Sequence, residues 1–240
     1  MISKNEIKYI QSLCHKKQRQ QDNIFIAEGT KIIEELLNSC YNVKKIYATN
    51  DWMSKNTPTK VQVIEVSEQE MSRLSSLQTP SSVLAIVETN SSENLVIKGK
   101  INVVLDGIQD PGNFGTIIRI ADWFGIENIF CSEDTVNVYN NKVIQSSMGS
   151  FVRVNIWYGN IETIIHKSSL PVFGAVLNGK NIDEQPNIEE GFLIIGNEGN
   201  GIRTNMLPYI TYPITIPKKG GAESLNAAVA TGILLSKLVK

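Results

Sequence analysis

Side chains that could bind a polar ligand or handle a proton occur in three separate segments of the chain, each following directly on an apolar run. They are Asn113, Arg119, Glu198, Ser224 and Asn226. Each segment also contains glycine, which lets the backbone turn tightly and approach a flat ligand closely. In open α/β sheets, ligands bind at the carboxyl ends of the strands. Together the three segments therefore predict one site, although each alone has a plainer interpretation.

The first segment runs from Asp106 to Arg119. The apolar, β-branched residues 101–105 predict a buried strand, and the Pro-Gly pair after it predicts a sharp turn. Asn113 then occupies a position where a helix favours a capping side chain. Arg119 lies about 200° around that helix from Ile117, at about 100° per residue, so it points away from the apolar face.

Structural alternatives remain open for all three segments. Asp122, one helical turn from Arg119, could engage that arginine in a surface ion pair. The second segment, 193–201, could be a turn in which Glu198 is simply solvated. The third could be an ordinary strand-turn-helix connection in which Ser224 caps the last helix.

Length and composition are those of an ordinary globular protein with one large or two small domains: 240 residues, 42% hydrophobic and 20% charged. The formal net charge of -1 gives no indication of a nucleic-acid partner. The first 20 residues differ, because their basic side chains outnumber the acidic ones. These are Lys4, Lys8, Lys16, Lys17 and Arg19, against Glu6 alone. Such a stretch is either a solvated helix face or a basic arm that contacts nucleic acid.

The cysteines and histidines argue against several kinds of site. Cys14, Cys40 and Cys131 are odd in number and widely separated, which fits neither a disulfide framework nor a zinc site and indicates a reducing cytoplasm. His15 and His166 match no metal-ligand pattern, so no metal is expected. The polar N-terminus cannot be a secretory signal, and no apolar run approaches the ~20 residues that span a bilayer. We therefore expect a cytoplasmic protein that does not enter a membrane.

Nucleotide-binding patterns match poorly. The phosphate-binding pattern GxxxxGK[ST] is absent, and Gly112 with Gly115 gives only a GxxG spacing, short of the dinucleotide fingerprint GxGxxG. Glu133 lies about twenty residues further on, where a ribose-binding acid could sit. A small-molecule Rossmann enzyme remains an alternative, and it predicts nicotinamide or flavin binding and indifference to RNA.

The elements that must position the three segments fall into two groups. Residues 1–90 predict a small α/β domain. Its helices are expected at 4–15, 30–37 and 67–74; Ser3 is expected to cap the first of them, and a Ser67–Glu70 capping box the third. Its strands are expected at 24–26, 43–48, 61–66 and 83–88, and polar loops at 16–22 and 50–60. A polar, serine-rich stretch predicts a linker at 91–99.

Residues 100–240 repeat strand and helix in turn, which favours a mostly parallel sheet covered on both faces. Strands are expected at 101–107, 128–131, 154–158, 172–177, 192–196 and 212–216, and helices at 113–124, 142–149, 161–167 and 224–238.

The motifs together resemble a known family, the SpoU (TrmH-like) RNA 2′-O-methyltransferases of the SPOUT class. Residues 106–125 are similar to its first motif, 195–201 to its second and 216–226 to its third, and 146–150 resemble the Ser-x-Gly segment between them. Residues 16–29 are similar to its N-terminal substrate-binding domain, so the resemblance covers nearly the whole chain. One departure is Lys218, where many members carry methionine.

The resemblance implies an α/β fold with a C-terminal trefoil knot, a topology that ordinary connection rules would exclude. It implies S-adenosylmethionine as the cofactor, held by Gly196, Asn197, Ile216, Leu225 and Asn226. The reaction implied is methyl transfer to a ribose 2′-hydroxyl, with Arg119, Asn113, Glu198, Ser224 and Asn226 as catalytic residues. A guanidinium is a poor base at neutral pH, so we favour Arg119 as an organiser of phosphate and developing alkoxide.

The resemblance further implies a homodimer packed across the knot, for which the small residues of helix 224–238 are suited. It implies RNA contact by the N-terminal domain through Lys16, Lys17, Arg19, Glu28 and Gly29. Structured ribosomal RNA is expected ahead of transfer RNA, because the substrate domain is separate. An RNA-binding assembly factor of the same fold without catalysis is the second hypothesis, and the complete polar set argues against it.

Overall fold

The computed structural model describes residues 2–56, 61–90 and 96–239, so part of the expected linker lies outside the described residues. The chain forms two compact units. The first contains residues 1–91 together with 139–152, and the second contains 92–138 and 153–240. We expected one boundary between the two domains, whereas in the structure the chain returns to the first unit at residues 139–152.

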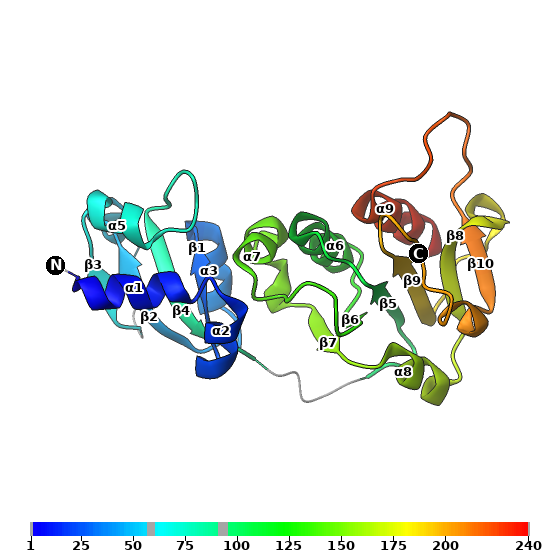
Figure 1. The fold of residues 1–240 in the computed structure, drawn as a ribbon, viewed down its shortest axis with the longest axis horizontal. Coiled ribbons are helices and arrows are strands. Elements are labelled where there is room, and N and C mark those ends of the chain that lie inside the picture. The colour runs from blue at the N-terminus through cyan, green and yellow to red at the C-terminus, as the bar shows by residue number, and fades with distance from the viewer. Residues whose placement is uncertain (1, 57–60, 91–95, 240) are drawn as a thin grey trace. The chain divides into compact units, whose positions relative to one another are not determined.

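The first unit is built on a four-stranded sheet in the order β1-β4-β2-β3 (Figure 1). Its strands are β1 (Ile24–Glu28), β2 (Val43–Ala48), β3 (Val63–Glu65) and β4 (Val83–Glu88), and its helices are α1 (Lys4–Ser12), α2 (Lys16–Asp22), α3 (Thr30–Leu37), α4 (Asn50–Lys55) and α5 (Glu68–Leu74). The β2–β3 pair is parallel, and β4 is antiparallel to both of its neighbours. The Ser3 cap and the Ser67–Glu70 capping box are confirmed.

Two expected loops of this unit contain helices. The stretch 16–22 is helix α2, and our prediction of a loop there was wrong. Arg19 explains the difference, because its side chain turns inward and donates from Nη1 to the carbonyls of Leu13 at 3.0 Å and Cys14 at 2.8 Å. A polar sequence can thus be helical when its basic residue completes the preceding helix end. In the stretch 50–60, α4 is anchored by Trp52, which is buried.

The return segment carries helix α7 (Asn141–Ser147) and a 3-10 turn, η1 (Ser150–Val152). Its aromatic side chains complete the core of the first unit. The ring of Tyr139 stacks on that of Phe25 with centroids 4.6 Å apart, and Phe151 meets Phe25 edge-on at 6.0 Å. Gln145 donates from Nε2 to the main-chain oxygen of Glu28 at 2.8 Å.

The second unit is built on a six-stranded sheet in which every strand pair is parallel, confirming the predicted α/β class. The order is β10-β8-β9-β5-β6-β7. The strands are β5 (Ile101–Asp106), β6 (Asn128–Cys131), β7 (Asn155–Tyr158), β8 (Val172–Asn181), β9 (Gly191–Gly196) and β10 (Tyr212–Thr215). Strands β5 and β9 lie at the centre and are almost entirely buried, as parallel strands covered on both faces must be.

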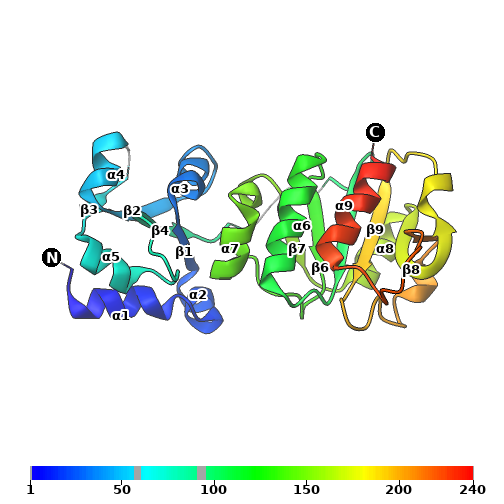
Figure 2. The ribbon, with the colours of Figure 1, turned by 90° about the horizontal axis from the view of Figure 1, so that it is seen from above.

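Helices α6 (Pro111–Trp123) and α9 (Ala227–Leu238) lie side by side over this sheet (Figures 1 and 2). A third helix, α8 (Ile161–Ser168), follows β7 in the sequence. Short 3-10 turns, η2 (Ile182–Glu184) and η3 (Leu207–Tyr209), complete the unit. Both expected caps are displaced. Asp110, not Asn113, caps α6, and Asn226, not Ser224, caps α9. The displacement leaves the side-chain amide of Asn113 free to make another contact. No helix among the described residues is long and apolar enough to cross a membrane.

Candidate active site

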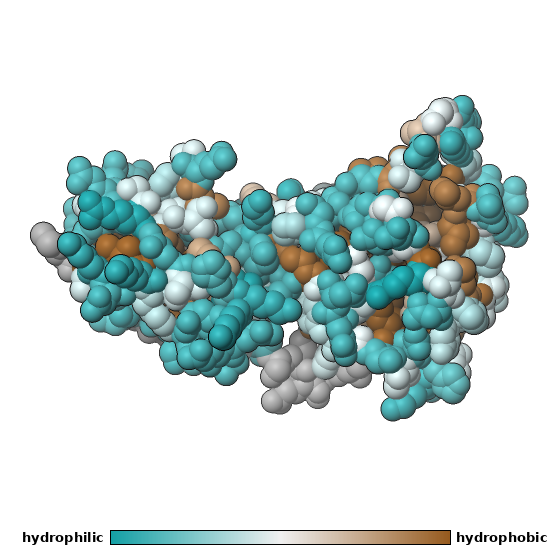
Figure 3. Space-filling model, viewed as in Figure 1, coloured by the Kyte–Doolittle hydropathy of each residue, from teal (hydrophilic) through white to brown (hydrophobic). Residues whose placement is uncertain are grey.

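A cavity of about 770 Å³ opens at the carboxyl edge of the second sheet, beside β8, β9 and the segment that leads from β10 to α9. Gly196, Ile216 and Leu225 line it, together with apolar side chains of β8 and α9. Figure 3 shows the corresponding apolar hollow below the raised segment between β10 and α9. Parallel strands bring their carboxyl ends to a common edge, which is why residues so far apart in sequence share one cavity.

A chain of side-chain hydrogen bonds joins the three predicted segments at this edge. Asn113 donates from Nδ2 to Oε1 of Glu198 at 2.6 Å. Asn226 donates from Nδ2 to Oδ1 of Asn113 at 2.8 Å, while its own Oδ1 caps α9 by accepting from two backbone amides. Each amide thus has a fixed orientation, and the carboxylate of Glu198 is held at one end. The structure brings these three predicted residues together.

The loop after β9 is closed by its own backbone. Asn197 and Gly201 exchange two main-chain hydrogen bonds, at 3.1 and 2.8 Å. A Cβ added to Gly196 would lie 2.1 Å from the carbonyl carbon of Gly201, so only glycine permits this close return. The side chain of Asn197 donates to the carbonyl of Gly107 at 2.8 Å and accepts from the amide of Gly199 at 2.9 Å. The loop is therefore fastened to the end of β5.

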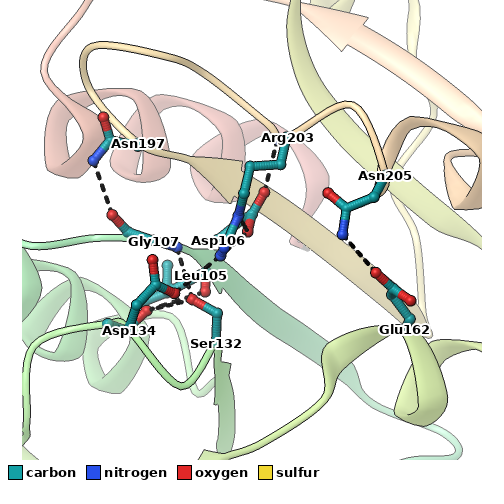
Figure 4. A network of polar contacts seen from close by, with 10 residues as sticks. Leu105, Asp106, Gly107, Ser132, Asp134, Glu162, Asn197, Arg203 and Asn205 are labelled. Atoms are coloured by element: carbon teal, nitrogen blue, oxygen red, sulfur yellow. Dashed lines mark hydrogen bonds and ion pairs between the residues drawn. The ribbon is translucent and has the colours of Figure 1, made fainter.

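An ion-pair network lies beneath the same loop (Figure 4). The side chain of Asp106 is 1% exposed, and Arg203 donates to it from its backbone N at 2.8 Å and from Nε at 2.6 Å. Arg203 also pairs with Asp134 at 3.0 Å. These contacts, mainly with Asp106, raise the pKa of Arg203; a Ser132 hydrogen bond and then Arg203 lower the pKa of Asp134.

Sequence reasoning missed Arg203 as a site residue. Asp106 was identified only as the start of the first motif, and its partner lies 97 residues away. The available signal was a buried acidic residue at the end of an apolar strand, which requires a partner. Nothing in the spacing indicated which of the basic residues would supply it.

The other predicted residues of this unit are arranged differently. Ser224 is exposed and lines the cavity without capping a helix. Arg119 is exposed on α6, six residues beyond Asn113 and so about 9 Å further along the axis. Its side chain forms no hydrogen bond or ion pair within the part of the chain that the structure describes. Asp122, its suggested partner, instead accepts a bidentate pair of hydrogen bonds from Arg153.

The residues predicted to contact RNA lie in the first unit. Lys16 and Lys17 are exposed at the start of α2, as a surface role requires. Arg19 is 4% exposed and bonded to carbonyls, so the structure does not support our expectation that it contacts phosphate. Glu28 is equally buried and accepts hydrogen bonds from Ser75 and Ser76. Gly29 adopts a φ of 106° at the N-cap of α3.

Chemically, the edge combines an apolar cavity with carboxylates and oriented amides. Among the described residues there is no cluster of three or more His, Cys, Asp or Glu that could hold a metal. Two acidic side chains, Glu198 and Glu223, and two basic ones, Lys218 and Lys219, line the cavity, so its walls offer apolar surface and partners for charges of either sign. Fold and site together define an α/β protein with a ligand-sized cavity at the carboxyl edge of a parallel sheet.

The chain belongs to the SpoU rRNA Methylase family, whose profile matches residues 100–236, and it is a methyltransferase. Residues 4–85 match the MRM3-like substrate binding domain. A 23S rRNA (guanosine(2553)-2′-O)-methyltransferase of Bacillus subtilis is 32% identical over 242 residues, with 98% of this chain and 97% of the relative covered.

Solved structures agree with this assignment. A protein of the TrmH family of RNA methyltransferases from Porphyromonas gingivalis has a TM-score of 0.89 and 36% identity, covering 100% of this chain and 98% of its own. An rRNA methyltransferase from Sinorhizobium meliloti with bound AdoMet has a TM-score of 0.88 and 28% identity, covering 99% of this chain and 95% of its own.

Proposed function

We propose that this protein transfers a methyl group from S-adenosylmethionine to a ribose 2′-hydroxyl of ribosomal RNA. The observation that carries the proposal is the hydrogen-bonded chain Glu198–Asn113–Asn226, which reaches the cavity through Glu198. It joins the three segments that the family resemblance assigned to one site. The relatives named for 2′-O-methylation of 23S rRNA support the choice of substrate.

The cavity suits the cofactor. Its volume of about 770 Å³ lies in the range of small-molecule sites. Ile216 and Leu225 offer apolar walls to an adenine ring, and the loop at Gly196 and Asn197 offers main-chain groups to its edge. Among the charged lining residues, Glu198 and Glu223 favour a positive charge nearby, whereas Lys218 and Lys219 favour a negative one. When bound, S-adenosylmethionine supplies an electrophilic methyl group on a positively charged sulfur.

The residues of the chain then have to align the attacking oxygen and handle its proton. Asn113 and Asn226 hold each other and Glu198 in one orientation, and Ser224 adds a hydroxyl at the cavity wall. Arg119, which has no partner among the described side chains, is available to an RNA phosphate and to charge developing on the 2′-oxygen.

A trefoil knot is the second part of the proposal. Strand β10 lies at the edge of the sheet beside β8, yet α9, which follows it, packs next to α6 and over β9 at the centre. The chain must therefore cross back over β8 after residue 216. Residues 216–220 and 222–225 line the same cavity as the loop 197–201, which supports a threaded crossing there.

The N-terminal unit is proposed to bind RNA through Lys16 and Lys17, whose ammonium groups are exposed and suit phosphate contacts. The match of residues 4–85 to a substrate binding domain supports this role. With ribosomal RNA as its substrate, the enzyme would act in the cytoplasm.

A homodimer that packs through α6 and α9 completes the proposal. The small residues of α9 are used within the chain, since Gly232 faces Ile120 of α6. Support comes instead from two exposed apolar side chains, Trp123 at 84% and Val229 at 51%. We expect Trp123→Lys to sediment as a monomer in analytical ultracentrifugation while the wild type sediments as a dimer; a monomeric wild type would contradict this part.

The test of the main proposal measures methyl transfer from labelled S-adenosylmethionine to ribosomal RNA, with cofactor binding followed by calorimetry. We expect wild type to bind and transfer, and Arg119→Ala to bind the cofactor but transfer at least about 10³-fold more slowly. RNA binding without cofactor binding would instead favour a non-catalytic assembly factor. Mapping ribose methylations in rRNA and tRNA from a deletion strain then identifies the target nucleotide.

A further inference from the structure

The pair between Asp106 and Arg203 differs from the surface ion pairs of this unit. The carboxylate is 1% exposed, whereas both side chains of the Lys237–Asp183 pair are about half exposed. Arg203 gives Asp106 both a backbone and a guanidinium hydrogen bond, so it neutralises the buried charge and fixes its direction. An exposed pair contributes little, but a buried carboxylate without its partner is costly.

Arg203 lies two residues after the closed loop 197–201. That loop has two attachments to the end of β5, one on each side of Glu198. Before Glu198, Asn197 bonds to the carbonyl of Gly107. After it, Arg203 bonds to the carboxylate of Asp106. Glu198 is therefore carried on a segment that is fastened at both ends to consecutive residues of one strand end.

We propose that Arg203 is a positioning residue that holds the loop 197–201 in the shape that binds the cofactor. The inference rests on the proposed function of this cavity and deepens it. If the contact between Arg203 and Asp106 is removed, the loop keeps its internal hydrogen bonds but is no longer held in a fixed position relative to the end of β5. Glu198 and the main-chain groups near Gly196 then no longer have fixed positions in the cavity wall.

The shape of the guanidinium makes arginine specific at this position. Nε and one terminal nitrogen of Arg203 reach Asp106, while the terminal group also reaches Asp134. A lysine ammonium is a single point charge and cannot give Asp106 the two side-by-side contacts of a planar guanidinium. Lysine can still neutralise Asp106, so Arg203→Lys separates the need for charge from the need for geometry.

The experiment compares cofactor and RNA affinity in matched variants. Calorimetry measures the Kd of S-adenosylmethionine for wild type, Arg203→Met, Arg203→Lys and the double variant Asp106→Asn with Arg203→Met. RNA affinity is measured on the same samples by filter binding, and hydrogen exchange reports the amides of 197–203. Lys237→Met, which breaks an exposed pair of the same unit, is the control.

We expect Arg203→Met to weaken cofactor binding about tenfold or more, with RNA affinity within about twofold of wild type. Arg203→Lys should recover part of that loss, and Lys237→Met should match wild type. The double variant removes the buried charge, so it should regain thermal stability but not cofactor affinity. Faster hydrogen exchange should be confined to the amides of residues 197–203.

Cofactor affinity that stays at the wild-type value in folded Arg203→Met or in the double variant would overturn the inference and leave Arg203 with a role in stability alone. A wild-type protein that does not bind S-adenosylmethionine would instead refute the proposed function. The two failures are thus distinguished by the wild-type measurement.

Discussion

The two edges of the second sheet both carry asparagines, but the environments of these asparagines are opposite. At the amino edge, Asn128 and Asn155 are the first residues of β6 and β7, and Asn102 is the second residue of the neighbouring β5. Asn102 and Asn128 are fully buried and join in a ladder, with Asn155 donating to Asn128, Asn128 to Asn102, and Asn102 to the carbonyls of Lys100 and Gly191. At the carboxyl edge, Asn113 and Asn226 are partly or fully exposed and bond to each other and to a carboxylate.

This difference shows that burial and the kind of partner decide what an asparagine does. The amides at the amino edge satisfy main-chain carbonyls that would otherwise be buried without partners, so they stabilise the strand register. The amides at the carboxyl edge orient one another next to a cavity and are only partly desolvated, so they contribute less to folding and more to alignment of a ligand. Substitution at the first edge should affect stability, and at the second it should affect activity.

Of the asparagines at the two edges, Asn226 is expected to show the largest effect. Asn226→Asp keeps an oxygen that can cap α9 but loses the amide that donates to Asn113. A carboxylate there would also face the oxygen of Asn113 unfavourably. We expect kcat to fall about 10²- to 10³-fold, or about 3–4 kcal/mol, with little change in the melting temperature.

Asn226→Ala is the matched comparison, because it removes both the cap and the donor. It should lose similar activity and also about 1 kcal/mol of stability. Wild-type turnover in Asn226→Asp would show that the side-chain chain at the carboxyl edge is structural, as at the amino edge.

The next effect tests the amino edge. Asn102→Ala removes a fully buried amide, so the carbonyl of Gly191 and the amide nitrogen of Asn128 each lose one hydrogen bond. We expect a loss of about 2–3 kcal/mol in the free energy of unfolding, measured by urea denaturation, with kcat of the folded fraction unchanged. A stable Asn102→Ala that turns over slowly would reverse the proposed division between the edges.

Which edge an asparagine belongs to could be predicted from the sequence, but what it bonds to could not. The strands and their mostly parallel arrangement followed from the hydrophobic runs and the alternation of strand and helix. The convergence of residues 113, 198 and 226 at one edge of the sheet was therefore predictable. The cap positions were not, because Asp110 and Asn113, like Ser224 and Asn226, are all good capping residues within three positions of each other.

Long-range pairing was equally beyond the sequence. The partner of Asp106 lies 97 residues away, and the burial of Arg19 depends on two carbonyls at the end of the preceding helix. Likewise, the aromatic contacts of Tyr139 and Phe151 that assign 139–152 to the first unit come from packing, which hydrophobic periodicity does not specify.

A smaller effect is expected at Asn197, which lies at the carboxyl edge but bonds as the amino-edge asparagines do. Its amide donates to the carbonyl of Gly107, and its oxygen accepts from the amides of Gly199 and Asn200. Asn197→Asp keeps the acceptor and loses the donor. We expect cofactor Kd to rise about tenfold, or about 1.4 kcal/mol, with kcat at saturating cofactor within about threefold of wild type. A fall in kcat as large as that of Asn226→Asp would mean that position at the edge outweighs the kind of partner.

The smallest effect is expected where the carboxyl edge meets solvent, at Asp134. Its side chain is 50% exposed, and the pKa of its carboxyl is lowered from the ordinary 3.8, first by a hydrogen bond from Ser132 and then by Arg203. A lowered pKa means that the ionised form stabilises the fold above about pH 5 and that this contribution is lost as pH falls through the folded-state pKa. Asp134→Asn should therefore melt about one degree below wild type at pH 7, and the two melting curves should converge in acid. Because Asp106 keeps Arg203 in place without Asp134, cofactor affinity should not change. A tenfold loss of affinity would mean that the outer carboxylate, and not the buried one, sets the position of the loop.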